Sequence, residues 1–363
     1  MAFLSCAYFL GLPLLAQTGR IVLPHFAADK ANFESQITIE NRSDRRQTFS
    51  IQHRRENGNF LSLQNISLAA GERQFLELPN VDGIEPSHAL IDGSAGLFAG
   101  ITYTPTMNRD NPIFIQGITQ FSKRWRIYPS NWNESFDGLA IVNPSCLSTI
   151  VRVRLYDKKG NFIEEIQRGA PLEQSAKWVF SPENYFAYQP GIFLEIAGDQ
   201  QLAVMSLKGN RDFQREDSIL VGNLAVPFSH YEDMRIRLNE NRDKWSRAGF
   251  GGNYQYQMSR ICFCLPEYTQ PVQIKVANFQ FNTLDYLATG MPVELARITD
   301  FVTIEGLFDL IETAFDRNIS DVYVTYHETL GYPTSVGFDL DSCLADEEYS
   351  FQITQVETLD PNN

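Results

Sequence analysis

The segment ITIENRSDRRQTFSIQHRRENGNF, residues 37–60, has a counterpart 102 residues later in LAIVNPSCLSTIVRVRLYDKKGNF, residues 139–162. In each copy an alternating apolar stretch leads to Asn-x-Ser, a second alternating stretch follows, and a Gly-Asn turn ends the pattern. The Asn and the Gly are 17 residues apart in both copies. Strand, polar loop, strand and tight turn in this order are typical of an antiparallel sheet.

The similarity extends further along the chain, with an offset that stays between 102 and 105 residues. The matching stretches are residues 74–78 with 177–180, 97–103 with 201–206, and 114–118 with 219–224. A period of about 100 residues that carries six or seven short strands matches a β-sandwich domain. We therefore predict two tandem antiparallel β-sandwiches of Ig-like type, at residues 20–124 and 125–228.

The first residues have the pattern of an export signal. Residues 3–15 are an uncharged apolar run of 13 residues, and Leu14-Leu15-Ala16 precedes polar residues as a cleavage site does. A run of that length spans about 20 Å as a helix, whereas the hydrocarbon layer is about 30 Å thick. We predict a signal peptide at residues 1–16, a secreted or periplasmic location and no transmembrane segment in the mature chain. The alternatives are a buried helix or a membrane anchor.

Charge is distributed unevenly along the 363 residues. Residues 1–250 contain 27 acidic and 26 basic side chains, whereas residues 251–363 contain 17 acidic and only 4 basic ones. The change indicates a separate C-terminal domain, which we place at residues 229–363. Because an acidic domain repels phosphate backbones, we expect no nucleic acid partner and instead an unknown protein or glycan partner.

The C-terminal region combines two helical patterns with six strand patterns. Residues 230–248 place Met234, Leu238 and Trp245 on one helical face, and residues 304–315 form a second apolar face behind a capping Thr303. The predicted strands are residues 254–264, 272–281, 283–288, 321–327, 334–340 and 349–356. The order α-βββ-α-βββ predicts an α+β domain of two similar halves, each a helix on a three-stranded antiparallel sheet, so the chain as a whole is mainly β plus α+β.

The same region contains a characteristic set of aromatic, cysteine and turn motifs. They are Trp245, the Tyr-x-Tyr at Tyr254 and Tyr256, Cys262-Phe263-Cys264, Thr-Ile-x-Gly-Leu-Phe at residues 303–308 with Phe308, Val324-x-Tyr326, Leu330-Gly331-Tyr332-Pro333, Asp339, and Asp346-Glu347. With these motifs the region resembles a bacterial family of exported domains of unknown function, the family numbered 6174. His327 departs from it, since an acidic residue is expected after the tyrosine. The resemblance implies export and a domain boundary and gives no catalytic residues to transfer.

The N-terminal region has a resemblance of its own. Leu23-Pro24-His25-Phe26 is followed by the Asn-x-Ser loops at Asn41 and Asn143. In these features both copies resemble a bacterial extracellular β-sandwich repeat, which implies a structural spacer rather than an activity.

Four cysteines remain once the signal peptide is removed, namely Cys146, Cys262, Cys264 and Cys343. An even number in an exported protein favours disulfides. In an extended strand the Cα atoms of Cys262 and Cys264 would lie near the upper limit of about 7 Å for a bridge. We therefore expect one of them to bond to Cys343, while Cys146 either pairs with the leftover cysteine or remains a thiol.

Two metal sites are alternatives to this interpretation. The ligand types of a structural zinc centre are present in Cys262, Cys264, His327 and Cys343. An acidic loop around Cys343 offers carboxylates for Ca²⁺, namely Asp339, Asp341, Asp346 and Glu347. Because Cys-x-Cys is not the usual zinc spacing and no EF-hand pattern is present, we expect no cofactor.

The sequence carries no motif of a known catalytic class. His25, His53, His88 and His230 have no partners at catalytic spacing and are expected to be surface or satisfied core residues. We predict a non-catalytic exported binding or structural protein, in which the acidic C-terminal domain faces the partner. The alternatives are a hydrolase with an inter-domain site, for which His327, Asp339 and Glu347 would have to meet, and a cysteine-based metal or redox protein.

Overall fold

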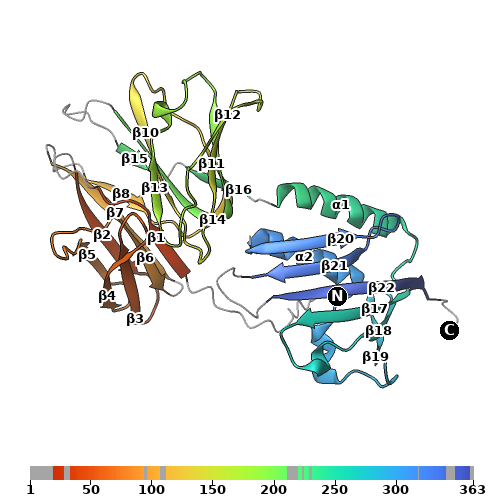
Figure 1. The fold of residues 1–363 in the computed structure, drawn as a ribbon. Helices are drawn as coiled ribbons and strands as arrows, with labels where there is room; N and C mark the ends of the chain where they lie inside the picture. The colour runs from red at the N-terminus through yellow and green to blue at the C-terminus, as the bar shows by residue number, and fades with distance from the viewer. Residues whose placement is uncertain are drawn as a thin grey trace, which may run out of the picture. The chain divides into compact units, whose positions relative to one another are not determined.

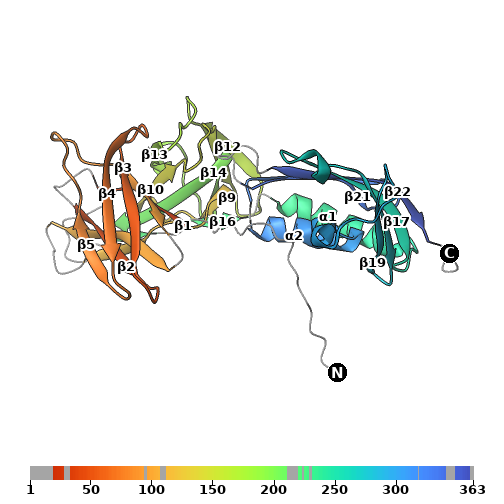
Figure 2. The same ribbon diagram turned by 90° about the horizontal axis from the view of Figure 1, so that it is seen from below.

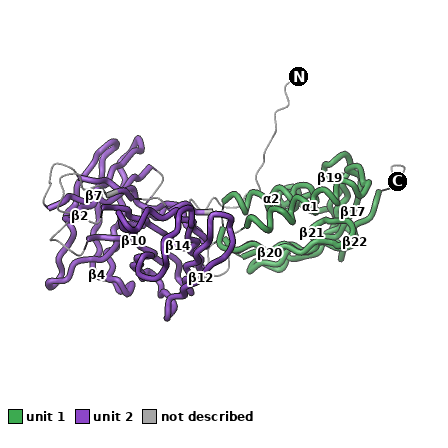
Figure 3. The backbone as a smooth tube through the Cα atoms, turned by 90° about the horizontal axis from the view of Figure 1, so that it is seen from above, with its two compact units in different colours: residues 1–14, 229–363 green, residues 15–228 purple. Residues whose placement is uncertain are grey.

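The computed structural model describes residues 19–27, 33–93, 96–106, 112–210, 220–222, 225–228, 231–317, 319–340 and 348–359. The chain divides into two compact units, of which one ends at Phe228 and the other contains the described residues from Tyr231 onward (Figure 3). The fold is mainly β, with two α-helices in the C-terminal unit. The predicted signal peptide and the residues Asp341, Cys343, Asp346 and Glu347 lie outside the described part of the chain.

The first sandwich consists of two four-stranded antiparallel sheets (Figure 1). One has the order β1 (Gly19–Leu23), β6 (His88–Gly93), β3 (Gln47–Arg54) and β4 (Phe60–Leu68). The other has the order β5 (Arg73–Glu77), β2 (Phe33–Asn41), β7 (Leu97–Pro105) and β8 (Ile113–Gln116). Side chains alternate along β2, so that Ile37 and Ile39 are fully buried between the sheets while Glu40 points outward.

The second sandwich repeats this arrangement with one fusion. Its strands are β9 (Ser122–Ile127), β10 (Ser135–Val142), β11 (Val151–Tyr156), β12 (Phe162–Gln167), β13 (Lys177–Phe180), β14 (Phe193–Asn210), β15 (Leu220–Gly222) and β16 (Val226–Phe228), with a short 3-10 turn at Pro182–Asn184. The 18-residue strand β14 pairs with β11 and β9 through its first part and with β10 and β15 through its second part. It therefore takes the places of both β6 and β7, and it joins the strands of this sandwich into one eight-stranded sheet.

The Asn-x-Ser motif has the same structural role in both copies. Asn41 and Asn143 are completely buried. The Nδ2 of each donates to three backbone carbonyls, at 2.7 to 3.2 Å, and the Oδ1 of each accepts bonds from the backbone N and the Oγ of the Ser two residues later. A buried amide with all its donors and acceptors used fixes the polar loop that joins two strands. The two copies of the predicted repeat thus make the same hydrogen bonds around this Asn.

The C-terminal unit is a single antiparallel sheet covered on one face by both helices (Figure 2). Its elements are α1 (Glu232–Arg247), β17 (Tyr254–Cys262), β18 (Val272–Ala277), β19 (Gln280–Tyr286), α2 (Ile304–Arg317), β20 (Asp321–Tyr326), β21 (Pro333–Asp339) and β22 (Tyr349–Thr358), with 3-10 turns at Pro266–Tyr268 and Leu295–Asp300. The predicted order α-βββ-α-βββ is confirmed. The two three-stranded halves are not separate sheets, however, because β17 pairs with β22 and joins them into the order β19-β18-β17-β22-β21-β20.

Both predicted helices are present with the predicted faces. Leu238 and Trp245 of α1 are buried, and α2 buries six apolar side chains. Thr303 caps α2, since its Oγ1 accepts a bond from the backbone N of Gly306 at 3.0 Å. Among the described residues, neither helix is long and apolar enough to cross a bilayer.

One predicted strand runs through a hairpin turn in the structure. The sequence pattern placed residues 272–281 in one strand, but β18 ends at Ala277 and a hairpin turn follows. Asn278 and Phe279 have φ angles of 52° and 64°, in the left-handed region. Asn adopts that conformation readily, whereas a Phe there is unusual, so the run of apolar residues concealed the turn.

Candidate functional site

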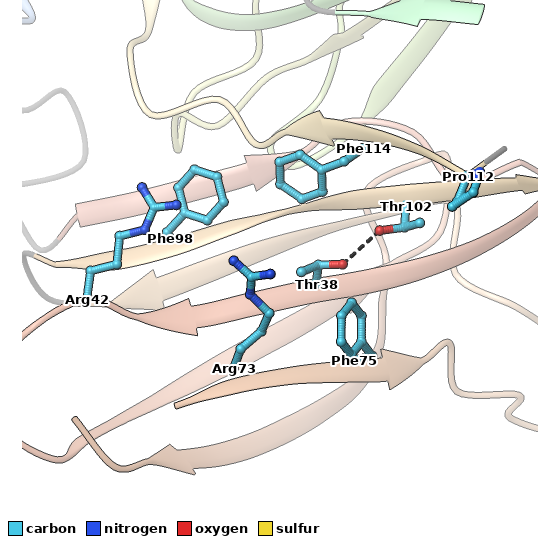
Figure 4. Close-up of a pocket in the computed structure, with 8 residues that line it drawn as sticks. All are labelled: Thr38, Arg42, Arg73, Phe75, Phe98, Thr102, Pro112 and Phe114. Carbon is cyan, nitrogen blue, oxygen red and sulfur yellow. Dashed lines mark hydrogen bonds between the residues drawn. The ribbon is translucent and has the colours of Figure 1, made fainter. Parts of the chain in front are cut away.

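The outer face of the β5-β2-β7-β8 sheet carries a groove of about 430 Å³ (Figure 4). Eight residues line this surface, which we call the aromatic groove: Thr38, Arg42, Arg73, Phe75, Phe98, Thr102, Pro112 and Phe114. They come from four strands or the loops beside them, and the strand alternation that turns Ile37 and Ile39 inward turns Thr38 outward. Phe75 is 59% exposed and Phe114 is 42% exposed, so two large apolar side chains of this groove face solvent.

The aromatic side chains of the groove are held in a defined geometry. Phe98 and Phe114 stack with ring centroids 5.5 Å apart, as Figure 4 shows. The ring of Phe114 lies over Gly100, where an added Cβ would come within 2.5 Å of its Cε2. Gly100 therefore lets the ring lie flat on the strand. Thr38 and Thr102 share a hydrogen bond between their Oγ1 atoms at 2.7 Å.

Two guanidinium groups flank the rings. The Cζ of Arg42 lies 3.6 Å from the centroid of Phe98. Arg73 donates to Glu40 at 2.7 Å, and Arg42 lies 3.3 Å from the other oxygen of Glu40. The hydrogen bond from Arg73, and secondly that from Arg42, lowers the pKa of Glu40, so this carboxylate is charged and holds both guanidiniums in place. The result is a surface that offers aromatic rings and delocalised cations, suited to binding rather than to proton transfer.

A second polar cluster lies at the junction of the two sandwiches. Lys177 is 4% exposed, and its Nζ donates to the backbone O of Ser87 at 2.9 Å and to Nδ1 of His25 at 3.2 Å. His88 is completely buried, and its Nε2 donates to the backbone O of Ser175 at 2.7 Å. These bonds join residues of the first sandwich to residues of the second.

The junction shifts the titration of all three groups. Burial, and then the charge of Lys177, lowers the pKa of His25 and of His88 to about 3. Burial also lowers the pKa of Lys177 to about 8, against the opposing effect of Glu56. At neutral pH both histidines are therefore neutral, His25 as an acceptor and His88 as a donor. The cluster is a buried contact between the two sandwiches.

The sequence motifs of the C-terminal unit lie in its core. Trp245 donates through Nε1 to Glu305 at 2.9 Å, and Tyr254 donates its hydroxyl to the same carboxylate. The hydroxyl of Tyr254 also accepts a bond from the backbone N of Ile304 at 3.0 Å. Burial, followed by the charge of Glu305, raises the pKa of Tyr254. This network connects α1, β17 and the start of α2, so it accounts for the motif as a structural element.

The remaining motif residues also pack internally. Phe308 is 1% exposed and its ring stacks with that of Tyr326 at 6.4 Å. Tyr332 is 6% exposed and packs against Trp245. Gly331 has a φ of 79° beside the backbone of Asn241, which leaves no space for a Cβ, and Pro333 begins β21. These residues hold the helix layer on the sheet rather than forming a pocket.

The cysteines are arranged differently from the expected pairing with Cys343. The structure bonds Cys262 to Cys264, whose Cα atoms lie 5.3 Å apart. The expectation of a spacing near the limit assumed an extended strand, but β17 ends at Cys262 and the chain bends there, which shortens the distance. Cys146 is partly exposed in the loop after Asn143.

Of the candidate metal and catalytic residues that the structure describes, His327 does not meet Asp339 or Cys262. His327 follows the end of β20, where its Nδ1 accepts bonds from the backbone N atoms of Thr329 and Leu330. Asp339 lies at the other end of the same hairpin, opposite Asp321. Cys262 lies at that end of the sheet too, because it pairs with Tyr349, which pairs with Phe338. Six residues of strand separate the two ends by about 20 Å. Within the described ranges, no three His, Cys, Asp or Glu side chains form a group that could hold a metal ion.

Sequence reasoning missed both the aromatic groove and the junction. The groove combines residues from Thr38 to Phe114 that meet only through strand pairing, and the junction joins His25 to a lysine 152 residues away. One signal was available, since outward positions of strands such as Phe75 and Phe114 can be identified from alternation. Two aromatic residues on the outward face of one sheet indicate an interaction surface.

Comparison with known proteins finds a family match for the C-terminal region alone. No curated protein matches this chain, and no solved structure matches it. The family match does not extend to the residues before 237. It confirms the resemblance that the motifs indicated: residues 237–358 of this chain match the family of unknown function DUF6174.

Proposed function

We propose that the protein is a non-catalytic exported binding protein and that the aromatic groove is its main contact surface. The observation that carries this proposal is the exposure of Phe75 and Phe114 beside two fixed guanidiniums. Clustered exposed apolar side chains mark interaction sites, and aromatic residues and Arg supply much of the energy of such contacts. The partner would be a protein or a glycan with an apolar surface.

The C-terminal unit supports a second contact surface in the same proposal. Phe263 is 80% exposed between the two bonded cysteines, and Leu265 is 61% exposed. A short covalent ring limits the motion of Phe263 and thus the entropy lost when it binds. This apolar projection favours the idea that the acidic domain also faces a partner.

The hydrolase alternative has less support. His327 and Asp339 lie at opposite ends of one hairpin, and the residues lining the aromatic groove include no nucleophile paired with a base. A cysteine-based metal site would need thiolates at Cys262 and Cys264, which are instead bonded to each other. Binding is therefore the function that the geometry favours.

Export and the Cys262–Cys264 bond are parts of this proposal that one measurement tests together. We expect the exported chain to lack residues 1–16 and to weigh two hydrogens less than its reduced form. Intact mass before and after reduction, followed by peptide mapping, gives both results. A chain that retains its N-terminus, or a peptide that links Cys262 to Cys343, would contradict this part of the proposal.

The groove is tested by affinity capture from the exported fraction of the native host. The wild-type chain and the variants Phe114→Glu, Phe263→Glu and Leu295→Glu serve as baits, the last as a matched control because Leu295 is 87% exposed on the C-terminal unit. We expect the wild type and the control to retain the same partner and Phe114→Glu to lose it. Equal capture by Phe114→Glu would overturn the assignment of the groove, and loss with Phe263→Glu alone would move the contact surface to the C-terminal unit.

A further inference from the structure

The aromatic groove of the first sandwich has a counterpart on the second sandwich, and strand pairing identifies it residue by residue. In the first sandwich Glu40 pairs with Arg73, and in the second Val142 pairs with Lys177. Glu40 and Val142 directly precede the buried Asn of the repeat in their copies. Lys177 of the junction therefore stands where the groove has Arg73.

The same register extends across the groove. Glu40 pairs with Phe98 on its other side, and Val142 pairs with Ala203. Four residues before Glu40, Gln36 pairs with Thr102, and Thr102 pairs with Phe114. Four residues before Val142, Gly138 pairs with Leu207, and Leu207 pairs with Gly222. Thr38, Phe98 and Phe114 thus correspond to Ala140, Ala203 and Gly222.

In the second sandwich this face is covered by the first. Ala140 and Ala203 are 3% and 0% exposed, although they point away from the interior of their own sandwich. A Cβ on Gly222 would meet the side chain of Ile115, and the backbone O of Pro144, the counterpart of Arg42, accepts a bond from Arg20 at 3.0 Å. The face that is a junction in one copy is therefore the open groove in the other.

The part of the first sandwich that covers this face also has a counterpart. It includes His88, which donates to the backbone O of Ser175 and pairs within its own sheet with Arg54; in the second sandwich the equivalent pair is Phe193 and Tyr156. Tyr156 and Phe193 stack with centroids 5.0 Å apart, Arg126 lies 4.7 Å from the Phe193 ring, and Tyr128 is 56% exposed beside them. We call these four residues the aromatic edge.

Resting on the proposed function, we propose that the groove of one chain receives the aromatic edge of a second copy of this chain. The chain already makes this contact once, between the equivalent surfaces of its two sandwiches. Rings and guanidiniums on both surfaces allow aromatic stacking and cation–π pairs. Such a contact is head-to-tail, so each added copy exposes a new groove or a new edge, and the copies add into a filament or a ring rather than into a two-fold dimer.

Sedimentation equilibrium over a concentration series tests this contact. The mature wild-type chain should show a weight-average mass that rises with concentration and passes that of a dimer. Phe114→Glu or Phe75→Glu on the groove, and Tyr128→Glu on the edge, should each weaken association about 10-fold or more. Leu295→Glu, on the C-terminal unit, should associate as the wild type does. Circular dichroism confirms that each variant is folded, and the two groove variants guard against a local folding defect.

A mixture of variants provides the decisive arm. Phe114→Glu retains an intact edge and Tyr128→Glu retains an intact groove, so neither elongates alone, but together they should form a 1:1 dimer that does not grow further. A wild-type chain that stays monomeric throughout, a dimer that stops growing in the wild type, or a mixture that stays monomeric overturns the inference. If the groove still captures another protein while the chain does not associate with itself, the proposed function stands and the self-contact fails.

Discussion

In the first sandwich the outer face of the β5-β2-β7-β8 sheet carries Phe98 and Phe114 beside two arginines, whereas in the second sandwich the same positions hold Ala203 and Gly222 and pack against the first. The buried Asn-x-Ser loops of the two copies make the same hydrogen bonds. Small residues allow a neighbouring domain to approach, and large aromatic residues provide a surface for a ligand. The two copies therefore share the buried residues that stabilise the fold and differ in the residues of the outer face, which contact different neighbours.

The shared interior predicts the largest effect. Asn143→Ala removes five hydrogen bonds of a buried amide and leaves three backbone carbonyls without that donor, so we expect a loss of about 3–5 kcal/mol in the free energy of unfolding. Asn41→Ala should lose a similar amount. Urea unfolding followed by tryptophan fluorescence measures both, since Trp125, Trp132 and Trp178 lie in this unit. Asn133→Ala, at an exposed position, is the control, and unequal losses at Asn41 and Asn143 would break the equivalence.

Two equivalent turn glycines distinguish the effect of the junction from that of the repeat, because only Gly58 lies against the other sandwich. Gly58 and Gly160 have φ angles of 87° and 85°, so alanine at either costs about 1–2 kcal/mol in strain. A Cβ on Gly160 meets nothing within 4 Å, whereas one on Gly58 would lie 2.8 Å from the backbone N of Ala176 in the other sandwich. We expect Gly58→Ala to destabilise by about 2 kcal/mol more than Gly160→Ala, measured by thermal unfolding. Equal effects would mean that the junction opens freely.

The junction also predicts a dependence on pH. The pKa of His88 is about 3 in the folded chain and 6.5 as its usual value. Below pH 6.5 the unfolded chain takes up a proton that the folded chain does not, so stability falls as the pH decreases from about 6.5 towards 3. At pH 5 the titration of His88 alone lowers the free energy of unfolding by about 2 kcal/mol.

Urea unfolding at pH 7 and pH 5 measures this loss. His88→Gln can still donate to the Ser175 carbonyl and cannot titrate, so its stability should fall by about 2 kcal/mol less than that of the wild type between the two pH values. His327→Gln in the C-terminal unit is the matched control and should change the stability of the sandwiches little. An unchanged pH dependence in His88→Gln would show that the junction is hydrated.

The smallest effect compares Lys177 with its counterpart Arg73. Lys177→Met leaves the Ser87 carbonyl and Nδ1 of His25 without this donor, at an expected cost of about 1–2 kcal/mol. Arg73→Met removes an ion pair whose arginine side chain is 53% exposed, and should cost less than about 0.5 kcal/mol. Chemical unfolding of both variants gives the difference. A larger loss for Arg73→Met would reverse the assignment of the open and the covered face.

Much of the fold was predictable from local sequence signals. Asn-x-Ser and the Gly-Asn turn recur at constant spacing, so they predicted both sandwiches, and the apolar faces with the Thr303 cap predicted both helices. The pairing of β17 with β22 was not predictable, because it joins strands about 90 residues apart and depends on global packing. The strands β1, β4 and β6 were not recognised individually. β1 and β6 are short and pair with strands far away in the sequence, whereas β4 forms a hairpin with β3 but buries only Leu68 of its nine residues, so its apolar pattern is weak.

The candidate site was much less predictable than the fold. The aromatic groove depends on four strands that bring Arg42, Phe75 and Phe114 together, and no local motif encodes that arrangement. The family motif pointed to the C-terminal unit, but Trp245 and Tyr254 are conspicuous because they form a buried network with Glu305. A strong motif in sequence can therefore describe a core, while a binding surface is spread over residues with no motif.

Hydroxyl-radical footprinting of the chain from residue 17 onward, at low and high concentration, tests the central claim most directly, because it measures the solvent access of individual aromatic side chains. The oxidation rates of Phe75, Phe114 and Tyr128 should fall as the concentration rises, while that of Tyr323, which is 65% exposed in the C-terminal unit, should stay constant. Rates at the groove that do not change with concentration, or that fall together with that of Tyr323, would contradict the account.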